Sequence, residues 1–422
     1  MAMENAEHHA GAPHAPGVRS AAGPGPRPGG MSAVLERALD ALAATHLGRA
    51  FPACAVAVRV GGVPLVERAW GACEDAPAHT HTWFDLASIT KLFTATAFLG
   101  LVGEGRIGLD DPLVSVVPEF AAGRARPPEA GQDPHTLLRQ PLSESGFADV
   151  DPGSITFRQL LTHTAGLQAW RDLFLQIDPM PGAQCRQGEA ARAQRALALI
   201  CGFGFAAAPG TRVLYSDLGF ILLGVVVARL CGLPLEAAIR ARVIDRLSCG
   251  DLDFNPLDSA RMRRDAIAPT ELDARWRGRR VRGEVHDENA CAMGGVAGHA
   301  GLFGHAAAVA AFGEAWRDDP QRVFGIPAHL AREACAQQVH TGAQRRGLGF
   351  ALKSPDAPSC GDLFSQASFG HTGYTGTSLW IDPQRGLVVA CLTNAVYYGR
   401  EMSALQPFRR ALHDCLVRAV DP

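Results

Sequence analysis

The sequence predicts an α/β plus all-α protein. In this fold class an antiparallel sheet flanked by helices is built from both termini, and a helical lobe is inserted between them. β-rich runs with turn residues lie near the two ends, at residues 53–71 and 378–394. Helical patterns dominate between them, from residue 157 to about residue 247. Strands so far apart in the chain share one sheet only when the helical segment is inserted between them. The 422 residues also exceed what one hydrophobic core usually supports, which agrees with two lobes.

The N-terminal part contains a tail, a helix and a hairpin in that order. Residues 1–30 are rich in glycine, proline and alanine and have almost no large apolar side chains, so we expect a disordered tail. Apolar residues then recur at helical spacing and predict an amphipathic helix over residues 31–47. Two β-rich runs flank Gly61 and Gly62, which predicts a hairpin. A long apolar helix is expected from about residue 87.

The remaining patterns set the expected domain limits. Residues 121–153 are rich in proline, glycine and alanine and lack periodicity, so they predict an inserted surface loop. The C-terminal strand signals contain a turn at residues 382–386, and a last helix is expected at residues 405–420. We therefore expect a sheet domain at residues 31–120 and 290–422, and a mainly helical domain with surface loops at residues 121–289.

Composition argues against several classes of function. The formal net charge is -2 without long blocks of like charge, so neither a nucleic-acid nor a membrane partner is predicted. The arginine-rich stretches near residues 261 and 277 could line a site for an acidic substrate, but a solvated surface loop is the preferred interpretation. The longest apolar run, residues 218–228, is too short to span a bilayer, and residues 1–30 lack the apolar core of a secretory signal.

The cysteines bear on the redox compartment. There are eleven of them; they form no C-x-x-C pair, and most have apolar neighbours. This pattern is typical of buried, reduced thiols and predicts a cytoplasmic protein.

Ser88 and Lys91 form an S-x-x-K motif at the start of the predicted apolar helix, where both side chains share one face. Asp85 is the expected N-cap of this helix. A serine hydroxyl needs a base to take its proton, and a desolvated lysine with a lowered pKa can be that base, whereas arginine stays protonated. Lys91 is one of only two lysines in the chain. The alternative is a chance match in which the lysine reaches the surface.

Two further motifs follow in order, Tyr215-Ser216-Asp217 in a turn before an apolar helix and His371-Thr372-Gly373 at a strand. The order S-x-x-K, Y-x-[ND], [KH]-T-G resembles the serine β-lactamase and penicillin-binding protein superfamily, with supporting stretches similar to its class C β-lactamase and esterase branch. The resemblance covers the chain from about residue 31 onward.

The resemblance implies a role for each motif residue. Ser88 would be the acylated nucleophile, Lys91 its proton acceptor, and Tyr215 a phenol that links both to the leaving group. The backbone N–H groups of Ser88 and Tyr374 would form the oxyanion hole. No cofactor or metal is implied.

The other motif residues would contact substrate. His371 would supply a polar or cationic contact beside Thr372, and Gly373 would let the substrate backbone approach. Two residues depart from the commonest pattern. Asp217 stands where asparagine is commonest and would add negative charge or need a partner, and His371 replaces the lysine of most β-lactamases.

Residues 267–304 resemble a branch of the superfamily found beside, or fused to, glycosidases that recycle peptidoglycan fragments. This Gly-rich stretch also brings polar side chains that could line the cleft, and its predicted substrate-binding residues are Glu271, His286, Asp287 and His299. A metal at His286, Asp287 and His299 is an alternative, but the spacing matches no metal motif, so hydrogen bonding or substrate contact is preferred. His163 is expected to be structural.

We therefore expect a cytoplasmic serine hydrolase that forms an acyl-enzyme and cleaves a small ester or amide, including fragments of peptidoglycan. Alternatives within the superfamily are a D-aminopeptidase, a D,D-carboxypeptidase or a weak β-lactamase. An alternative of another class is a ligand sensor that stays acylated.

Overall fold

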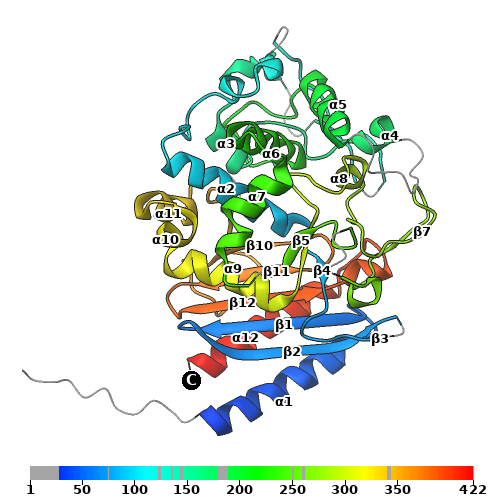
Figure 1. Cartoon of the computed structure of the whole chain (residues 1–422), viewed down its shortest axis with the longest axis vertical. Helices are drawn as coiled ribbons and strands as arrows, with labels where there is room; N and C mark the ends of the chain where they lie inside the picture. The colour runs from blue at the N-terminus through cyan, green and yellow to red at the C-terminus, as the bar shows by residue number, and fades with distance from the viewer. Residues whose placement is uncertain are drawn as a thin grey trace, which may run out of the picture.

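Strands from both ends of the chain pair in one sheet (Figure 1). The computed structural model describes residues 28–74, 76–121, 125–134, 136–142, 146–178, 189–249, 251–258, 262–339 and 344–421. The seven strands have the order β3-β2-β1-β12-β11-β10-β9, and all neighbours are antiparallel. They are β1 (Ala53–Val60), β2 (Val63–Cys73), β3 (Ala76–Pro77), β9 (Ala351–Leu352), β10 (Phe369–Thr372), β11 (Ser378–Asp382) and β12 (Leu387–Thr393). The predicted fold class is confirmed.

The pairing of β1 with β12 joins the two ends of the chain. In this register Val56 lies opposite Cys391. The β1–β2 hairpin turns at Gly61 and Gly62, whose φ values of 58° and 88° are in the left-handed region that a two-residue hairpin loop requires. The predicted hairpin is therefore present, and the sheet depends on both termini.

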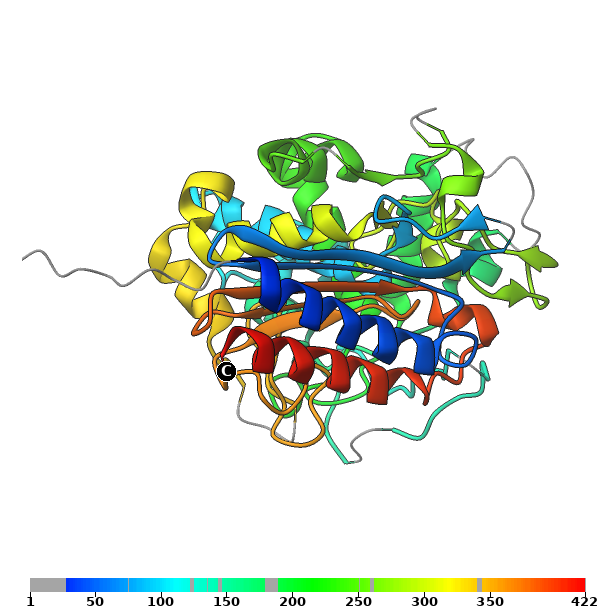
Figure 2. The same cartoon turned by 90° about the horizontal axis from the view of Figure 1, so that it is seen from below.

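Helices cover both faces of this sheet. On one face α1 (Pro28–His46) and α12 (Leu405–Val420) lie side by side, as Figure 2 shows. On the other face α9 (Ala306–Asp318) packs against β1, β11 and β12. The bounds of α12 are those predicted, whereas α1 begins before the predicted residue 31. Most of the tail predicted at residues 1–30 lies outside the described residues.

The second lobe is helical. Its centre is α2 (Thr90–Gly103), which packs against α6 (Asp217–Cys231) and α7 (Leu235–Arg242). Every residue of α2 from Thr90 to Leu101 is buried, as expected for a helix that is apolar on all sides. The other helices are α3 (Phe157–Leu161), α4 (Leu173–Ile177), α5 (Glu189–Gly202), α8 (Glu288–Ala292), α10 (Pro320–Phe324) and α11 (Ala328–Cys335). The limits of the two domains stay a prediction.

Short strands carry the connection between the lobes. β4 (Phe84–Asp85) and β5 (Leu252–Phe254) pair on either side of β8 (Leu302–Gly304), and β6 (Leu272–Asp273) pairs with β7 (Arg279–Arg280). Within the described residues, no single helix is long and apolar enough to cross a bilayer. The pair formed by α6 and residues 235–246 passes that test by length and composition but is bent by 75°.

Candidate active site

Ser88 lies on a single 3₁₀ turn, Ala87–Ile89, directly before α2. Ala87 has a φ of 47°, a left-handed conformation that is unfavourable for a residue with a Cβ. The expectation that Asp85 is the N-cap is wrong, because Leu86 occupies that position without a side-chain bond. The Asp85 carboxylate instead accepts from the Ala87 N–H (2.8 Å) and from the His286 N–H (2.6 Å). It therefore ties the nucleophile's turn to a distant segment, and burial raises its pKa to about 6.

Lys91 is fully buried and lies beside the Ser88 hydroxyl. Its Nζ donates to Ser88 Oγ (2.9 Å) and to the carbonyl of His299 (3.1 Å), and it lies 2.7 Å from Asp217 Oδ1. Burial alone would lower the pKa of Lys91, but the Asp217 carboxylate and Tyr215 outweigh burial and raise it above its usual value. The predicted lowering of the Lys91 pKa is therefore wrong, whereas the partner that Asp217 was expected to need is Lys91.

The local sequence explains how Asp217 and Tyr215 reach this lysine. Ser216 is the N-cap of α6, and its side chain accepts from the Gly219 N–H. Tyr215 therefore stands just before the helix, and Asp217 occupies its first turn, where the helix dipole favours a carboxylate.

Three side chains surround the Tyr215 ring besides Lys91. His163 and His371 lie with ring centroids 4.4 Å and 5.9 Å away, and the guanidinium carbon of Arg346 is 5.2 Å from the Tyr215 centroid. His163 Nδ1 accepts from the Ser216 N–H (3.0 Å), so His163 fixes the backbone of the motif, the structural role that the sequence predicts.

His371 is the last buried residue of β10. Its Nδ1–H donates to the Thr372 carbonyl (2.7 Å), and burial together with Arg346 and Lys91 lowers the pKa of His371 to about 3. The imidazole is thus neutral at neutral pH. Of the two expected contacts, the cationic one is wrong and the polar one stands.

Gly373 holds the β10–β11 turn against the nucleophile. A Cβ at this position would lie 2.1 Å from Thr377 Oγ1 and 2.5 Å from the Leu86 carbonyl. Thr377 Oγ1 donates to that same carbonyl (3.0 Å). The glycine is therefore required by the protein's own packing beside Ser88, which corrects the expectation that it makes room for substrate.

A cavity of about 230 Å³ opens beside Ser88. It is lined by Ala87, Ser88, Pro134, Ala169, Trp170, Tyr215, Asp217, His286, Asp287, Glu288, His299, Ala300, Tyr374 and Arg400. Residues of the first two motifs and Tyr374, which follows the third, thus meet at one site. Both residues of the predicted oxyanion hole, Ser88 and Tyr374, border it; their role as N–H donors stays a prediction.

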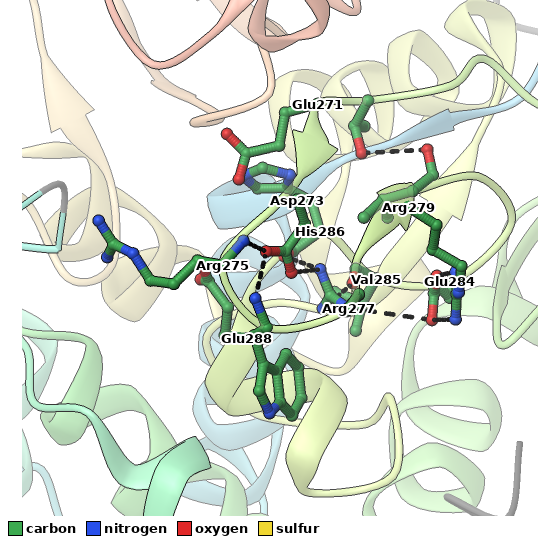
Figure 3. A network of polar contacts seen from close by, with 12 residues as sticks. Glu271, Asp273, Arg275, Arg277, Arg279, Glu284, Val285, His286 and Glu288 are labelled. Atoms are coloured by element: carbon green, nitrogen blue, oxygen red, sulfur yellow. Dashed lines mark hydrogen bonds and ion pairs between the residues drawn. The ribbon is translucent and has the colours of Figure 1, made fainter. Parts of the chain in front are cut away.

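The wall formed by residues 267–304 is built around a buried arginine (Figure 3). Arg277 donates to the carbonyls of Val285 (2.9 Å) and His286 (3.0 Å) and lies 3.5 Å from the Asp273 carboxylate. These contacts fix the backbone from which His286, Asp287 and Glu288 reach the cavity. Burial lowers the pKa of His286 to about 4, so its ring is neutral at neutral pH.

Glu271 does not line the cavity. Its carboxylate accepts from Arg400, which also pairs with Glu288 and donates to the Pro134 carbonyl (3.0 Å). The expected substrate contact of Glu271 is therefore indirect, through Arg400. Arg346 and Arg400 escaped sequence reasoning because both lie in irregular segments without a motif.

Three possible metal ligands come together, but not the predicted set. Ligand atoms of Asp217, Asp287 and His299 lie within 4.8 Å of one another, and His286 is not among them. Lys91 already pairs with Asp217, and Asp287 Oδ1 accepts from the Ala290 N–H (2.7 Å) and lies 2.9 Å from His299 Nε2. The chain's own contacts thus use these atoms, and the arrangement fits a divalent metal poorly.

Comparisons with known proteins agree with this geometry. A family model described as Beta-lactamase matches residues 35–413. A protein of Escherichia coli K12 named "Putative D-alanyl-D-alanine carboxypeptidase" is 27% identical over 357 residues, covering 78% of this chain and 75% of the relative. Two solved structures share the fold. EstCE1, described as a hydrolase with promiscuous acyltransferase activity, has a TM-score of 0.67 at 19% identity, covering 90% of this chain and 99% of EstCE1. A mutant of simvastatin synthase (LovD) from Aspergillus terreus has a TM-score of 0.65 at 18% identity, covering 93% and 96%.

Proposed function

The chain belongs to the beta-lactamase family, and we propose that it is a serine hydrolase that forms an acyl-enzyme on Ser88 and then hydrolyses it. The observation that carries this proposal is the contact of Ser88 Oγ with a buried lysine, 2.9 Å away, at the wall of a cavity. A hydroxyl held by a proton-transfer group and open to a cavity is the arrangement that nucleophilic catalysis requires.

In the acylation step, Ser88 Oγ attacks the carbonyl carbon of an ester or amide and loses its proton to a base. The tetrahedral intermediate then collapses, and the leaving group departs with a proton from the same relay. Water reverses these transfers and releases the acid. In the resting protein the Lys91 ammonium is paired with Asp217. Either Lys91 first gives up its proton, or Tyr215, which adjoins Lys91, takes the serine proton instead.

The other site residues would stabilise the reacting group. The N–H groups of Ser88 and Tyr374 would donate to the oxyanion, where preorganised donors contribute most to the rate. Neutral His371 and Thr372 would offer hydrogen bonds to the substrate rather than a charge.

The substrate is proposed to be a small ester or amide, and the cavity of about 230 Å³ supports a compact acyl group. The carboxypeptidase name of the relative and the hydrolase title of EstCE1 support amides and esters respectively. A fragment of peptidoglycan fits both, and the cytoplasmic location remains a proposal. A sensor that stays acylated is the competing function.

The test is acylation by p-nitrophenyl acetate, followed by mass spectrometry of the intact protein and by release of p-nitrophenol. We expect an acetyl group on Ser88 and continued turnover. Ser88→Ala should reduce both at least about a thousandfold, because other hydroxyls lack the base. Ser115→Ala, which removes an exposed hydroxyl, is the matched control. A single stoichiometric burst without turnover would favour the sensor, and acylation that survives Ser88→Ala would refute the nucleophile.

A further inference from the structure

We infer that the cavity beside Ser88 binds an ammonium group on the acyl part of the substrate, so that the preferred donors are esters or amides of α-amino acids. The inference rests on the proposed function, because it concerns the donor that acylates Ser88. It follows from the charges on the cavity wall, from the free oxygens there and from an unpartnered imidazole.

Acidic groups exceed basic groups on this wall. Three carboxylates line the cavity, those of Asp217, Asp287 and Glu288, against one guanidinium, Arg400. Arg400 already pairs with Glu288 and with Glu271 behind it. Lys91 is held by Asp217 in the same way, so neither cation is left without a carboxylate.

Asp287 is ionised at neutral pH. Burial opposes this, but the charge and hydrogen bond of His299 and the bond from the Ala290 N–H hold the pKa of Asp287 below its usual range. The wall therefore carries surplus negative charge, which favours a cationic substrate group and disfavours a carboxylate.

Both aspartates have an oxygen left to offer. The contacts of Asp287 use Oδ1, and the ion pair of Asp217 uses Oδ1. Across the part of the chain that the structure describes, Oδ2 of each residue takes part in no hydrogen bond, and the two side chains are 20% and 19% exposed. Ligand oxygens of the two residues lie within 4.8 Å of each other. A single ammonium, with three N–H donors and bonds of about 2.8 Å, can reach both.

His286 provides an independent observation. Its side chain lines the cavity, the residue is 4% exposed, and its Nδ1 is buried without a hydrogen-bond partner among the described residues. Because the ring is neutral, it can accept a hydrogen bond from an ammonium without repelling it. Trp170 and Tyr374 add aromatic surface to the same wall, which also suits a cation.

The place of the aspartates sets the place of the amino group. Asp217 and Ser88 contact the same atom, Lys91 Nζ, so the carboxylate lies within one side chain's reach of the nucleophile. An amino group on the carbon next to the scissile carbonyl would lie in this position. A divalent metal is the other possible occupant, but it would have to compete with the Lys91 ammonium.

The test compares alanine p-nitroanilides of both configurations with their N-acetyl derivatives. At pH 6.5 a free α-amino group, with a pKa of about 8, is charged, and acetylation removes only that charge. We expect kcat/KM to favour the free amine at least about tenfold. Asp287→Asn keeps an acceptor for the Ala290 N–H and should lower this preference about tenfold or more. Asp265→Asn, an exposed charge removal in a neighbouring loop, should leave the preference unchanged.

A second measurement does not depend on cleavage of an amide. Propylammonium should slow acylation of the wild type by p-nitrophenyl acetate, and propanol should not. Equal rates with free and acetylated donors, or protection by Zn²⁺ but not by propylammonium, would overturn the inference. Absence of any acylation by p-nitrophenyl acetate would instead contradict the proposed function, so the two failures are distinguishable.

Discussion

Lys91 Nζ lies 2.7 Å from Asp217 Oδ1, in an ion pair that adjoins the Ser88 hydroxyl. A lysine beside a nucleophilic serine acts as a base only when it is neutral, and this carboxylate favours its charged form. Aspartate in place of asparagine therefore changes the protonation state of the site, not only its charge. The resting protein holds its lysine one proton away from the form that could accept the serine proton.

Asp217→Asn should move the pH dependence of acylation. Without the carboxylate, burial dominates, and the pKa of Lys91 falls below its usual value. If Lys91 is the base, the rising limb of the single-turnover acylation rate moves to lower pH by about one unit or more. Stopped-flow acylation by p-nitrophenyl acetate at several pH values measures this shift. An unchanged limb would show that Lys91 is not the group that titrates.

Local rules predicted the fold because its elements are local. The glycine pair at 61–62 is sufficient to place the β1–β2 turn, and the apolar spacing of residues 405–420 gives α12 its observed bounds. Asp85 shows where such rules fail. It has the sequence position of a cap, but its carboxylate accepts from the N–H of His286, 201 residues away, a partner that only the tertiary structure supplies.

The site was predictable in its residues but not in its charges. The three motifs locate Ser88, Lys91 and Tyr215, since each motif names residue types that the chemistry needs. Burial of Lys91 was also evident from the apolar helix around it. The raised pKa was not, because it depends on Asp217, which reaches Lys91 from another helix. Arg400 enters the cavity from an irregular loop, where no periodicity exists to be read.

Gly373→Ala should destabilise the fold and slow acylation together. The added Cβ would overlap Thr377 Oγ1 and the Leu86 carbonyl, so the β10–β11 turn must move away from the turn that carries Ser88. Overpacking of this kind costs about 1–3 kcal/mol of unfolding free energy. Urea denaturation measures it. Gly202→Ala is the matched control, because a Cβ there meets nothing within 4 Å. Equal stability of the two variants would contradict the packing role.

Buried histidines should make the protein less stable in acid. Burial lowers the pKa of His371 to about 3 and of His286 and His413 to about 4, while unfolded histidine titrates near 6.5. Between these values the unfolded state binds more protons, so each histidine's contribution is complete above about pH 6.5 and is lost as the pH falls. Asp85, with its raised pKa, acts in the opposite direction below about pH 6.

The variant His413→Asn isolates one of these protons. His413 is fully buried, and its Nδ1–H donates to the Arg409 carbonyl, a bond that an asparagine amide can replace. The slope of unfolding free energy against pH should fall by nearly one proton, about 1.4 kcal/mol per pH unit, between pH 4 and 6.5. His329→Asn, at an exposed position, should leave the slope unchanged. A steeper slope in the His413 variant would reverse the assignment.

The last prediction separates the charge of Lys91 from its proton. Lys91→Arg keeps a cation beside Asp217 but cannot give up a proton, whereas Lys91→Ala loses both. If Lys91 is the base, both variants should lose acylation at least about a hundredfold. Their stabilities should differ, because the alanine variant leaves the Asp217 carboxylate without its buried counterion, at a cost of about 3 kcal/mol.

Tyr215→Phe completes this series. The phenol should matter more for amides than for activated esters, because an amide leaving group needs a proton in order to depart. Single-turnover acylation across pH, measured for the wild type and the three variants, gives the comparison. In the wild type the rate should still be rising above neutral pH, since Asp217 raises the pKa of Lys91. An arginine variant that acylates within about tenfold of the wild type would make Lys91 an electrostatic group only and would assign the serine proton to Tyr215.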